Sequence, residues 1–167
     1  MTKAEINSFC EYLNEQVNNH SIYVWGGQGE FVILKTLKDI ERMENSKTNF
    51  RRVCNLVNSL IQRGVDISRS RMFDCSGLGV FWLLEMKLIN HDMTANDMFK
   101  KCTEKPLNKI KKGDWVFKVN AEGKATHIGY VVDDSKSIVE AYGRDKGVIK
   151  AKLGNGSQFN RAGTFNG

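Results

Sequence analysis

Long apolar runs, proline-rich linkers and internal repeats are all missing from this chain of 167 residues, and proline occurs once. A bilayer-spanning helix needs about 20 apolar residues, and the first ten residues lack the apolar region of a signal peptide. We therefore expect a single domain over residues 1–167 with no membrane insertion, and this chain does not itself explain any export.

Metal and nucleotide motifs are missing as well. The four cysteines and three histidines form no CxxC or CxxH pair, which argues against a structural zinc site. The glycine-rich stretch 26–29 lacks the lysine and the Ser/Thr of a phosphate-binding loop. We therefore expect neither a metal nor another cofactor.

The charge of the chain is the first positive signal. A net charge of +6 favours a polyanionic partner, such as nucleic acid, an anionic membrane or an anionic cell-wall polymer. No helix-turn-helix, RNP-like or zinc-finger pattern is present, and the aromatic residues fit core positions better than a base-stacking surface. We expect no nucleic-acid partner, although a non-catalytic basic binding module stays open as an alternative.

Apolar periodicity places helices in the first two thirds of the chain. It predicts one helix over residues 3–18, two between Phe31 and Arg63, and a short one near 95–102. The expected inner faces of the middle pair are Ile33, Leu37, Ile40 and Met43 in the first helix and Phe50, Val53, Cys54, Val57, Leu60 and Ile61 in the second.

Strand signals dominate beyond Gly113. Residues 115–119, 127–132 and 137–142 are short runs rich in valine, isoleucine and aromatic residues, separated by polar turns. Helices followed by an antiparallel sheet form the α+β pattern, which is the fold class we predict. The C-terminal residues allow either a final strand or an ordered tail.

The most informative segment runs from Asp74 through an apolar stretch to Asn90, and it predicts a buried helix with Asp74 as its N-cap. A thiol at the first turn of a helix is favoured as a thiolate, because the helix dipole and a nearby cation lower its pKa. Gly77 and Gly79 are costly early in a helix unless a backbone or a substrate approaches closely. Cys75 is therefore the candidate nucleophile rather than an inert buried thiol.

A cysteine nucleophile needs an imidazole that takes and returns its proton. His127 begins a predicted strand, and Gly129 is expected to leave open space on the same strand face. A lone strand histidine is more often a surface or core residue, but its combination with Cys75 favours a general base.

A third group should accept a hydrogen bond from the other ring nitrogen of His127. A two-residue turn at Asp133-Asp134 places Glu140 across from His127, whereas a four-residue loop over 133–136 places Tyr142 there. We predict Glu140 as the acceptor.

Five short blocks occur in a characteristic order along most of the chain. They are Tyr23-Val24-Trp25-Gly26-Gly27, Asp74-Cys75-Ser76-Gly77, Gly113-Asp114-Trp115-Val116-Phe117, His127-Ile128-Gly129-Tyr130 and Glu140-Ala141. Together they resemble the NlpC-type (NlpC/p-sixty superfamily) papain-like cell-wall cysteine endopeptidases. The resemblance implies a papain-like fold, in which the nucleophile lies at a helix N-terminus packed on an antiparallel sheet.

The resemblance also implies roles for individual residues. Cys75 would be the nucleophile and His127 the base, while Glu140 would stand at a third position that relatives often fill with histidine or asparagine. The residues implied to contact the substrate are Tyr23, Trp25, Asp74 and Ser76. Among these, Asp74 would pair with a free amino group.

The stretch between Gly27 and Asp74 is longer than its usual counterpart in the family. Residues 28–73 are therefore expected to form a helical insertion, with nine Lys/Arg against five Asp/Glu and hence a net charge of +4. We expect this basic insertion to shape substrate access or to bind the cell wall.

The implied function is hydrolysis of an amide bond in the stem or cross-bridge peptides of peptidoglycan, and the commonest target in the family is the γ-D-glutamyl bond to a diamino acid. An N-acetylmuramoyl-L-alanine amidase or a related acyltransferase stays open. The protein would act at a bacterial cell wall, delivered by phage lysis as an endolysin, by another delivery machine, or within a longer secreted protein. An anionic wall polymer is a possible second partner.

Overall fold

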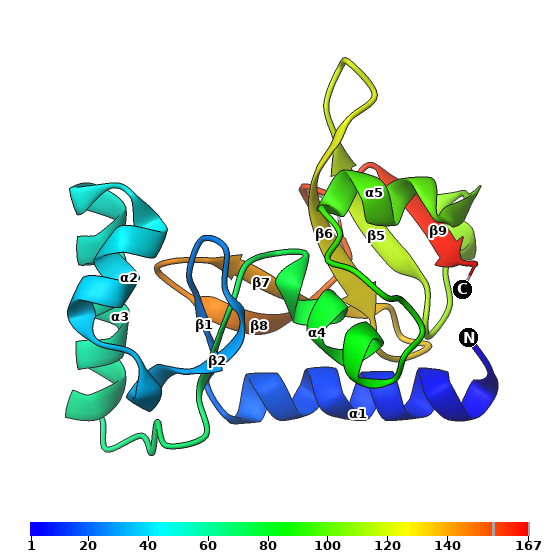
Figure 1. Ribbon diagram of the computed structural model, residues 1–167. Helices are drawn as coiled ribbons and strands as arrows, with labels where there is room; N and C mark the ends of the chain where they lie inside the picture. Colours follow the sequence, from blue (N-terminus) through cyan, green and yellow to red (C-terminus); the bar gives the residue numbers. More distant parts are fainter. Residues whose placement is uncertain (155, 167) are drawn as a thin grey trace.

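The computed structural model describes residues 1–154 and 156–166, which form helices around a six-stranded sheet and a smaller second sheet (Figure 1). The larger sheet has the strand order β4-β9-β5-β6-β7-β8, and every neighbouring pair is antiparallel. Its strands are β4 (Cys102–Lys105), β5 (Trp115–Val119), β6 (Ala125–Val131), β7 (Ser137–Gly143), β8 (Gly147–Lys152) and β9 (Arg161–Phe165). The predicted α+β class is confirmed.

The smaller sheet joins the two ends of the 28–73 segment. Its order is β1-β3-β2, with β1 (Ile22–Tyr23) parallel and β2 (Gln28–Phe31) antiparallel to the central β3 (Arg71–Phe73). The sequence pattern did not predict β2 and β3. Because β3 leads directly into Asp74, this small sheet fixes where the chain enters the next helix.

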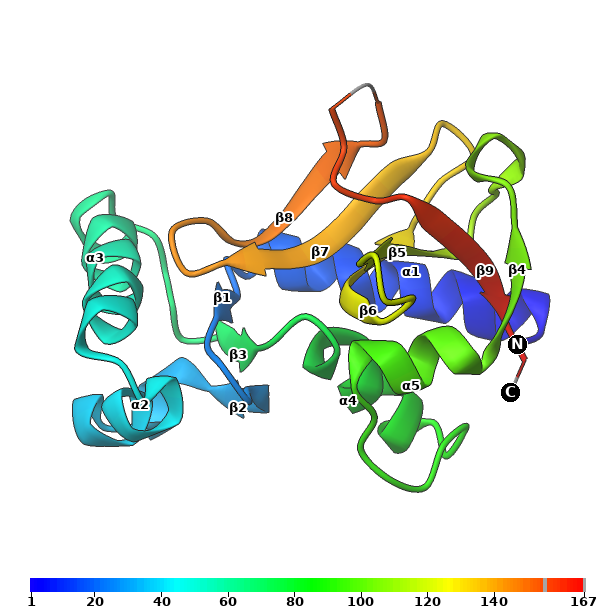
Figure 2. The same cartoon turned by 90° about the horizontal axis from the view of Figure 1, so that it is seen from above.

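The first predicted helix is confirmed as α1 (Lys3–Asn18), which begins with a capping box between Thr2 and Glu5. It runs along the six-stranded sheet (Figures 1 and 2) and buries Phe9 and Leu13. The Phe9 ring packs edge-on against the ring of Tyr130 on β6. Helix α5 (Ala95–Lys100) also packs on β6. Among the described residues, no helix combines the length and the apolar character that a bilayer crossing requires.

The 28–73 segment contains a 3-10 turn, η1 (Val32–Leu34), followed by α2 (Leu37–Glu44) and α3 (Lys47–Gln62). The predicted inner faces were wrong at Ile33, Leu37 and Ile61, which are 57%, 66% and 53% exposed. The reason is that a capping box at Thr36 starts α2 only at Leu37, so Ile33 belongs to the separate 3-10 turn and lies outside the helical periodicity. Figure 2 shows α2 and α3 beyond the turn between β7 and β8.

The apolar segment after Cys75 forms a shorter helix than predicted, α4 (Gly77–Glu85). Lys87 adopts a left-handed conformation with φ of 56°, and the N–H groups of Lys87 and Leu88 donate to the carbonyls of Leu84 and Leu83. This is the Schellman arrangement that ends a helix. The helix therefore stops well before Asn90, although the apolar run continues.

A buried carboxylate fixes the beginning of β5. Asp114 is 1% exposed and accepts hydrogen bonds from Lys105 Nζ at 2.8 Å, Lys111 N at 2.8 Å and Thr164 Oγ1 at 2.7 Å. These donors come from β4, from the loop before β5 and from β9. Asp114 therefore ties together three parts of the sheet.

We predict that Asp114→Ala lowers the free energy of unfolding by about 3–5 kcal/mol, because it leaves a poorly exposed lysine ammonium without its counter-charge. Urea unfolding measures the loss. Arg42→Ala is the control, because it breaks the exposed Arg42–Asp39 pair and should cost about 1 kcal/mol or less. Equal losses in the two variants would contradict this role for Asp114.

Candidate active site

Cys75 lies in the turn immediately before α4. The side chain of Asp74 caps this turn: its Oδ1 accepts hydrogen bonds from Gly77 N at 2.7 Å and from Ser76 Oγ at 3.1 Å. The predicted N-capping hydrogen bond of Asp74 is therefore present, although the regular helix begins only at Gly77. These bonds hold the backbone on both sides of the thiol.

The two glycines of α4 allow close packing against other parts of the protein. A Cβ atom at Gly77 would lie 2.2 Å from the carbonyl oxygen of Gly27, and one at Gly79 would lie 2.4 Å from the Tyr130 hydroxyl. The expected close approach is thus a backbone at Gly77 and an aromatic ring at Gly79. Both contacts press the N-terminal end of α4 against its neighbours.

The environment of Cys75 opposes its ionisation. Burial raises the pKa of the thiol to about 11, and the Asp74 carboxylate adds to this effect, while hydrogen bonding by the backbone N–H groups of Ser76 and Ile128 lowers the pKa. The lowering expected from the helix terminus is therefore outweighed. The Tyr130 hydroxyl, on β6, donates to the Cys75 carbonyl oxygen at 3.5 Å, so the turn that carries the thiol lies beside the strand of His127.

His127 and Glu140 are joined by a hydrogen bond of 2.6 Å between Nε2 and Oε2. This contact was predicted from a two-residue turn between β6 and β7, and that turn is wrong. The two strands pair Tyr130 with Val139 and Val131 with Ile138, which is the register of the four-residue loop 133–136. Glu140 is instead a diagonal neighbour of His127, and its long side chain covers the extra distance.

Two residues outside the predicted set support this pair. Gln158 Nε2 donates to Glu140 Oε2 at 3.1 Å, and the Phe159 ring stacks on the His127 ring with a centroid distance of 5.7 Å. Phe159 also fills the space expected to be open beside Gly129, where a Cβ atom would lie 2.8 Å from that ring. The imidazole is thus held at one edge and on one face.

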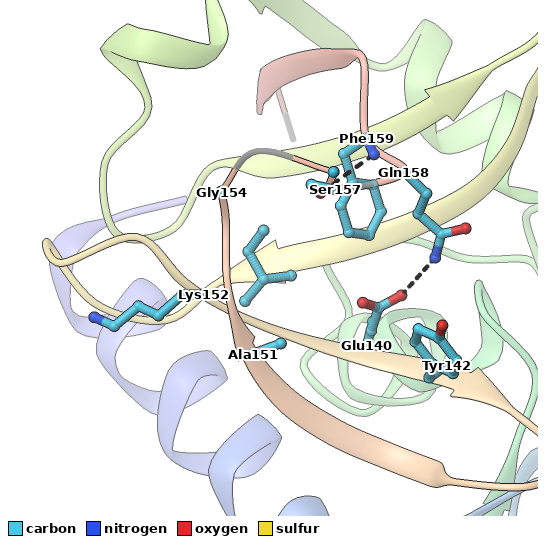
Figure 3. A pocket seen from close by; sticks show the side chains of 10 residues that line it. Glu140, Tyr142, Ala151, Lys152, Gly154, Ser157, Gln158 and Phe159 are labelled. Carbon is cyan, nitrogen blue, oxygen red and sulfur yellow. Dashed lines mark hydrogen bonds between the residues drawn. The ribbon is translucent and has the colours of Figure 1, made fainter.

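A cavity of about 330 Å³ opens next to Glu140 (Figure 3). Figure 3 shows the bond from Gln158 to Glu140, with Tyr142 beside it and Lys152 at the far end. The cavity therefore borders Glu140 and its partner Gln158, and neither Cys75 nor His127 lines it.

The predicted substrate residues fall into two environments. Tyr23 is buried, and burial raises the pKa of its hydroxyl, with the charges of Cys75 and Asp74 adding to the rise. Tyr23 is therefore close to Cys75, as Ser76 and Asp74 are. Trp25 is 61% exposed, and its backbone N–H donates to Glu44 Oε1 at 2.9 Å. The Trp25 ring thus lies at the surface.

Four residues near the site were not predicted, namely Glu44, Arg144, Gln158 and Phe159. They lie in α2, in the β7–β8 turn and in the chain before β9, and none belongs to a recognisable motif. No local sequence signal could have identified them. Within residues 1–154 and 156–166, no group of three or more His, Cys, Asp or Glu side chains could hold a metal ion.

Comparison with known proteins gives the same family by sequence and by structure. The sequence model of the NlpC/P60 family matches residues 61–161, more than half of the chain, and no curated protein matches the chain in sequence. The Tyr23–Gly27 block lies outside the matched residues.

Three solved structures are similar in fold. The NlpC/p60 domain of the peptidoglycan hydrolase SagA has 16% identity and a TM-score of 0.59, covering 99% of this chain and 100% of that one. NlpC2 from Trichomonas vaginalis has 15% identity and a TM-score of 0.60, covering 96% of this chain and 46% of that one. The peptidoglycan hydrolase RipB from Mycobacterium tuberculosis has 15% identity and a TM-score of 0.57, covering 99% and 69%.

Replacing His127 by alanine should move the alkylation of Cys75 to more alkaline pH. Burial and the Asp74 carboxylate oppose ionisation of the Cys75 thiol. If His127 accepts the thiol proton as proposed, the wild type can form a thiolate at lower pH, whereas the variant cannot, so the wild-type rate should level off at lower pH. Iodoacetamide labelling of the Cys75 peptide, followed by mass spectrometry across the pH range, measures both profiles.

His20→Ala serves as the control, because His20 lies in the turn after α1, away from this site. Its profile should match that of the wild type. Superimposable profiles for the wild type and His127→Ala would contradict a functional pairing of His127 with Cys75.

Proposed function

Because the chain belongs to the NlpC/P60 family, we propose that it is a peptidoglycan hydrolase in which Cys75, His127 and Glu140 cut an amide bond of the stem or cross-bridge peptides. The single observation that carries this assignment of residues is the His127–Glu140 hydrogen bond, on the strand whose Tyr130 hydroxyl donates to the Cys75 carbonyl oxygen. The titles of the similar SagA and RipB structures, which name peptidoglycan hydrolases, support the substrate class.

The proposed reaction begins with proton transfer from the Cys75 thiol to His127. Since Nε2 of His127 donates to Glu140, Nδ1 is the nitrogen that accepts the proton. The buried carboxylate stabilises the imidazolium that forms. The thiolate attacks the scissile carbonyl carbon, and the backbone N–H of Cys75 is positioned to donate to the developing oxyanion.

The second half of the reaction uses the same groups. The imidazolium returns its proton to the leaving amine as the C–N bond breaks, which leaves a thioester on Cys75. A water molecule, deprotonated by His127, then attacks the thioester carbonyl, and the thiol is regenerated as the carboxylic acid product leaves.

The proposed target is the γ-D-glutamyl bond to a diamino acid. Tyr23, Trp25, Asp74 and Ser76 are assigned to substrate binding. The two capping bonds of Asp74 both use Oδ1, so Oδ2 is the oxygen that would receive a substrate amino group. A carboxylate in this position suits a peptide with a free N-terminus.

Residues 28–73 are proposed to be an insertion relative to the family that binds an anionic wall polymer. Four of its exposed cationic residues carry no ion pair among the described residues, namely Lys38, Lys47, Arg51 and Arg63. Cations that are not internally neutralised attract polyanions most strongly. The proposed contribution is retention at the wall.

Cys75→Ala should abolish the release of fragments from purified cell walls, because the variant has no nucleophile. Glu140→Ala should lower the rate about 100-fold, and Glu140→Gln less, since its amide oxygen still accepts from His127. Turbidity loss and mass analysis of the released fragments measure the effects. New N-termini on diamino acids identify an endopeptidase, and free lactyl groups identify an amidase. Cys54→Ala is the thiol control, and wall hydrolysis by Cys75→Ala would sink the proposal.

Replacing Lys38, Lys47 and Arg51 by glutamine should weaken binding to walls about tenfold or more at low salt, since each basic residue near an anionic surface contributes about 1 kcal/mol. Lys87, Lys101 and Lys109, which are exposed outside the segment, provide a control with the same change in charge. Cosedimentation with intact walls and with walls stripped of anionic polymer measures binding. Equal losses in the two triple variants would contradict a specific role for residues 28–73.

A further inference from the structure

A buried ion pair connects the 28–73 segment to the candidate active site. Glu44, near the end of α2, is 4% exposed, and its Oε2 accepts from Arg144 Nε at 2.5 Å. Its Oε1 accepts from the backbone N–H of Trp25 at 2.9 Å. Both carboxylate oxygens are thus committed, one to the β7–β8 turn and one to the loop after β1.

The ion pair with Glu44 uses only the Nε edge of the Arg144 guanidinium. The hydrogen bond to Glu44 goes through Nε, and among residues 1–154 and 156–166 no protein acceptor is hydrogen-bonded to Nη1 or Nη2 of Arg144. The Arg144 side chain is 16% exposed, so it is not fully enclosed by the protein. Its position is fixed, but two of its nitrogen groups are still able to bind a ligand.

The guanidinium lies over the ring of Tyr23. Its central carbon lies 5.0 Å from the centroid of the Tyr23 ring, and the hydroxyl of Tyr23 is near enough to Cys75 and Asp74 to be affected by their charges. Tyr23 pairs with Phe73 in the smaller sheet, two residues before Cys75, so Arg144 packs on a residue next to the segment that carries the thiol. A planar guanidinium fork in this place is suited to a carboxylate on the residue beside the scissile bond.

We propose that Arg144 determines specificity by binding the free α-carboxylate of a γ-linked D-glutamyl residue, and that Glu44 is a positioning residue that holds Arg144. A γ-linked glutamyl residue keeps this carboxylate next to the bond that is cut, whereas an α-amidated residue offers a neutral amide. This inference rests on the proposed function, because it needs the glutamyl bond to be the target. It gives α2 of the basic segment a part in choosing the substrate.

The experiment compares two synthetic stem peptides that differ only at this group, one with the free α-carboxylate and one with an α-carboxamide. The wild type should prefer the carboxylate peptide by about tenfold or more in kcat/KM. Arg144→Lys should lower the preference because an ammonium cannot form the fork. The double variant Arg144→Gln with Glu44→Gln, which removes both charges and avoids an unpaired buried carboxylate, should lose the preference through KM.

Arg52→Gln is the matched control. Arg52 pairs with Asp145 on the same turn but is well exposed, so the preference should be unchanged. Circular dichroism and thermal unfolding confirm that each variant is folded. A folded double variant that keeps the preference, or that loses activity equally on both peptides, overturns the role of Arg144.

The two peptides also separate this inference from the proposed function. A wild type that cleaves both peptides equally overturns the inference alone. A wild type that cleaves neither, under conditions where a known endopeptidase does, overturns the glutamyl-bond assignment and the inference with it. Cleavage that depends on Cys75, with a preference for the carboxylate peptide that depends on Arg144, supports the proposed function and the inference.

Discussion

The contact between the backbone of Gly27 and the first turn of α4 determines where the Cys75 thiol lies. The carbonyl of Gly27 accepts a hydrogen bond from Asp74 N at 3.0 Å and leaves no room for a side chain at Gly77. Gly27 is equally confined, since a Cβ atom there would lie 2.9 Å from the Met72 backbone. The two backbones can approach this closely because the facing residues, Gly27 and Gly77, are both glycine. The loop after β1 and the turn that carries Cys75 therefore form one rigid unit.

Around this unit, three carboxylates hold the functional groups, and each accepts hydrogen bonds from two donors. Asp74 binds the helix terminus, Glu140 binds His127 and Gln158, and Glu44 binds Arg144 and the Trp25 backbone. A buried carboxylate without donors is strongly destabilising, so each group favours the arrangement of its partners. The polar side chains near the thiol therefore help to specify the fold as well as the chemistry.

The sequence predicted elements whose signals are local. Helix α1 and strand β5 have the predicted bounds, because apolar periodicity, alternation and a capping box are encoded within each segment. The β6–β7 turn was predicted wrongly because its geometry depends on side-chain bonds: Asp133 Oδ1 accepts from Ser137 N and Ser135 Oγ and thereby closes a four-residue loop. The Glu140 contact was nevertheless predicted, since a long carboxylate reaches His127 from the diagonal position.

Other features could not be predicted, because they depend on distant parts of the chain. Strand β8 ends in exposed residues and has no apolar alternation there, and the sequence pattern did not predict it. Glu44, Arg144 and Phe159 each lie far from Cys75 in sequence, and only the folded sheets bring them towards it. Their residue types are common at surfaces and in cores, and nothing in their neighbours distinguishes them.

The position of β9 has a consequence for biosynthesis. This strand follows all others in the chain but lies between β4 and β5, so both have an open edge until β9 has been made. Gln158 and Phe159, which hold Glu140 and His127, immediately precede it. Long-range pairings of this kind form late in folding. A nascent chain on the ribosome would thus carry the thiol without a supported imidazole, which ties the acquisition of hydrolytic activity to the completion of translation through β9.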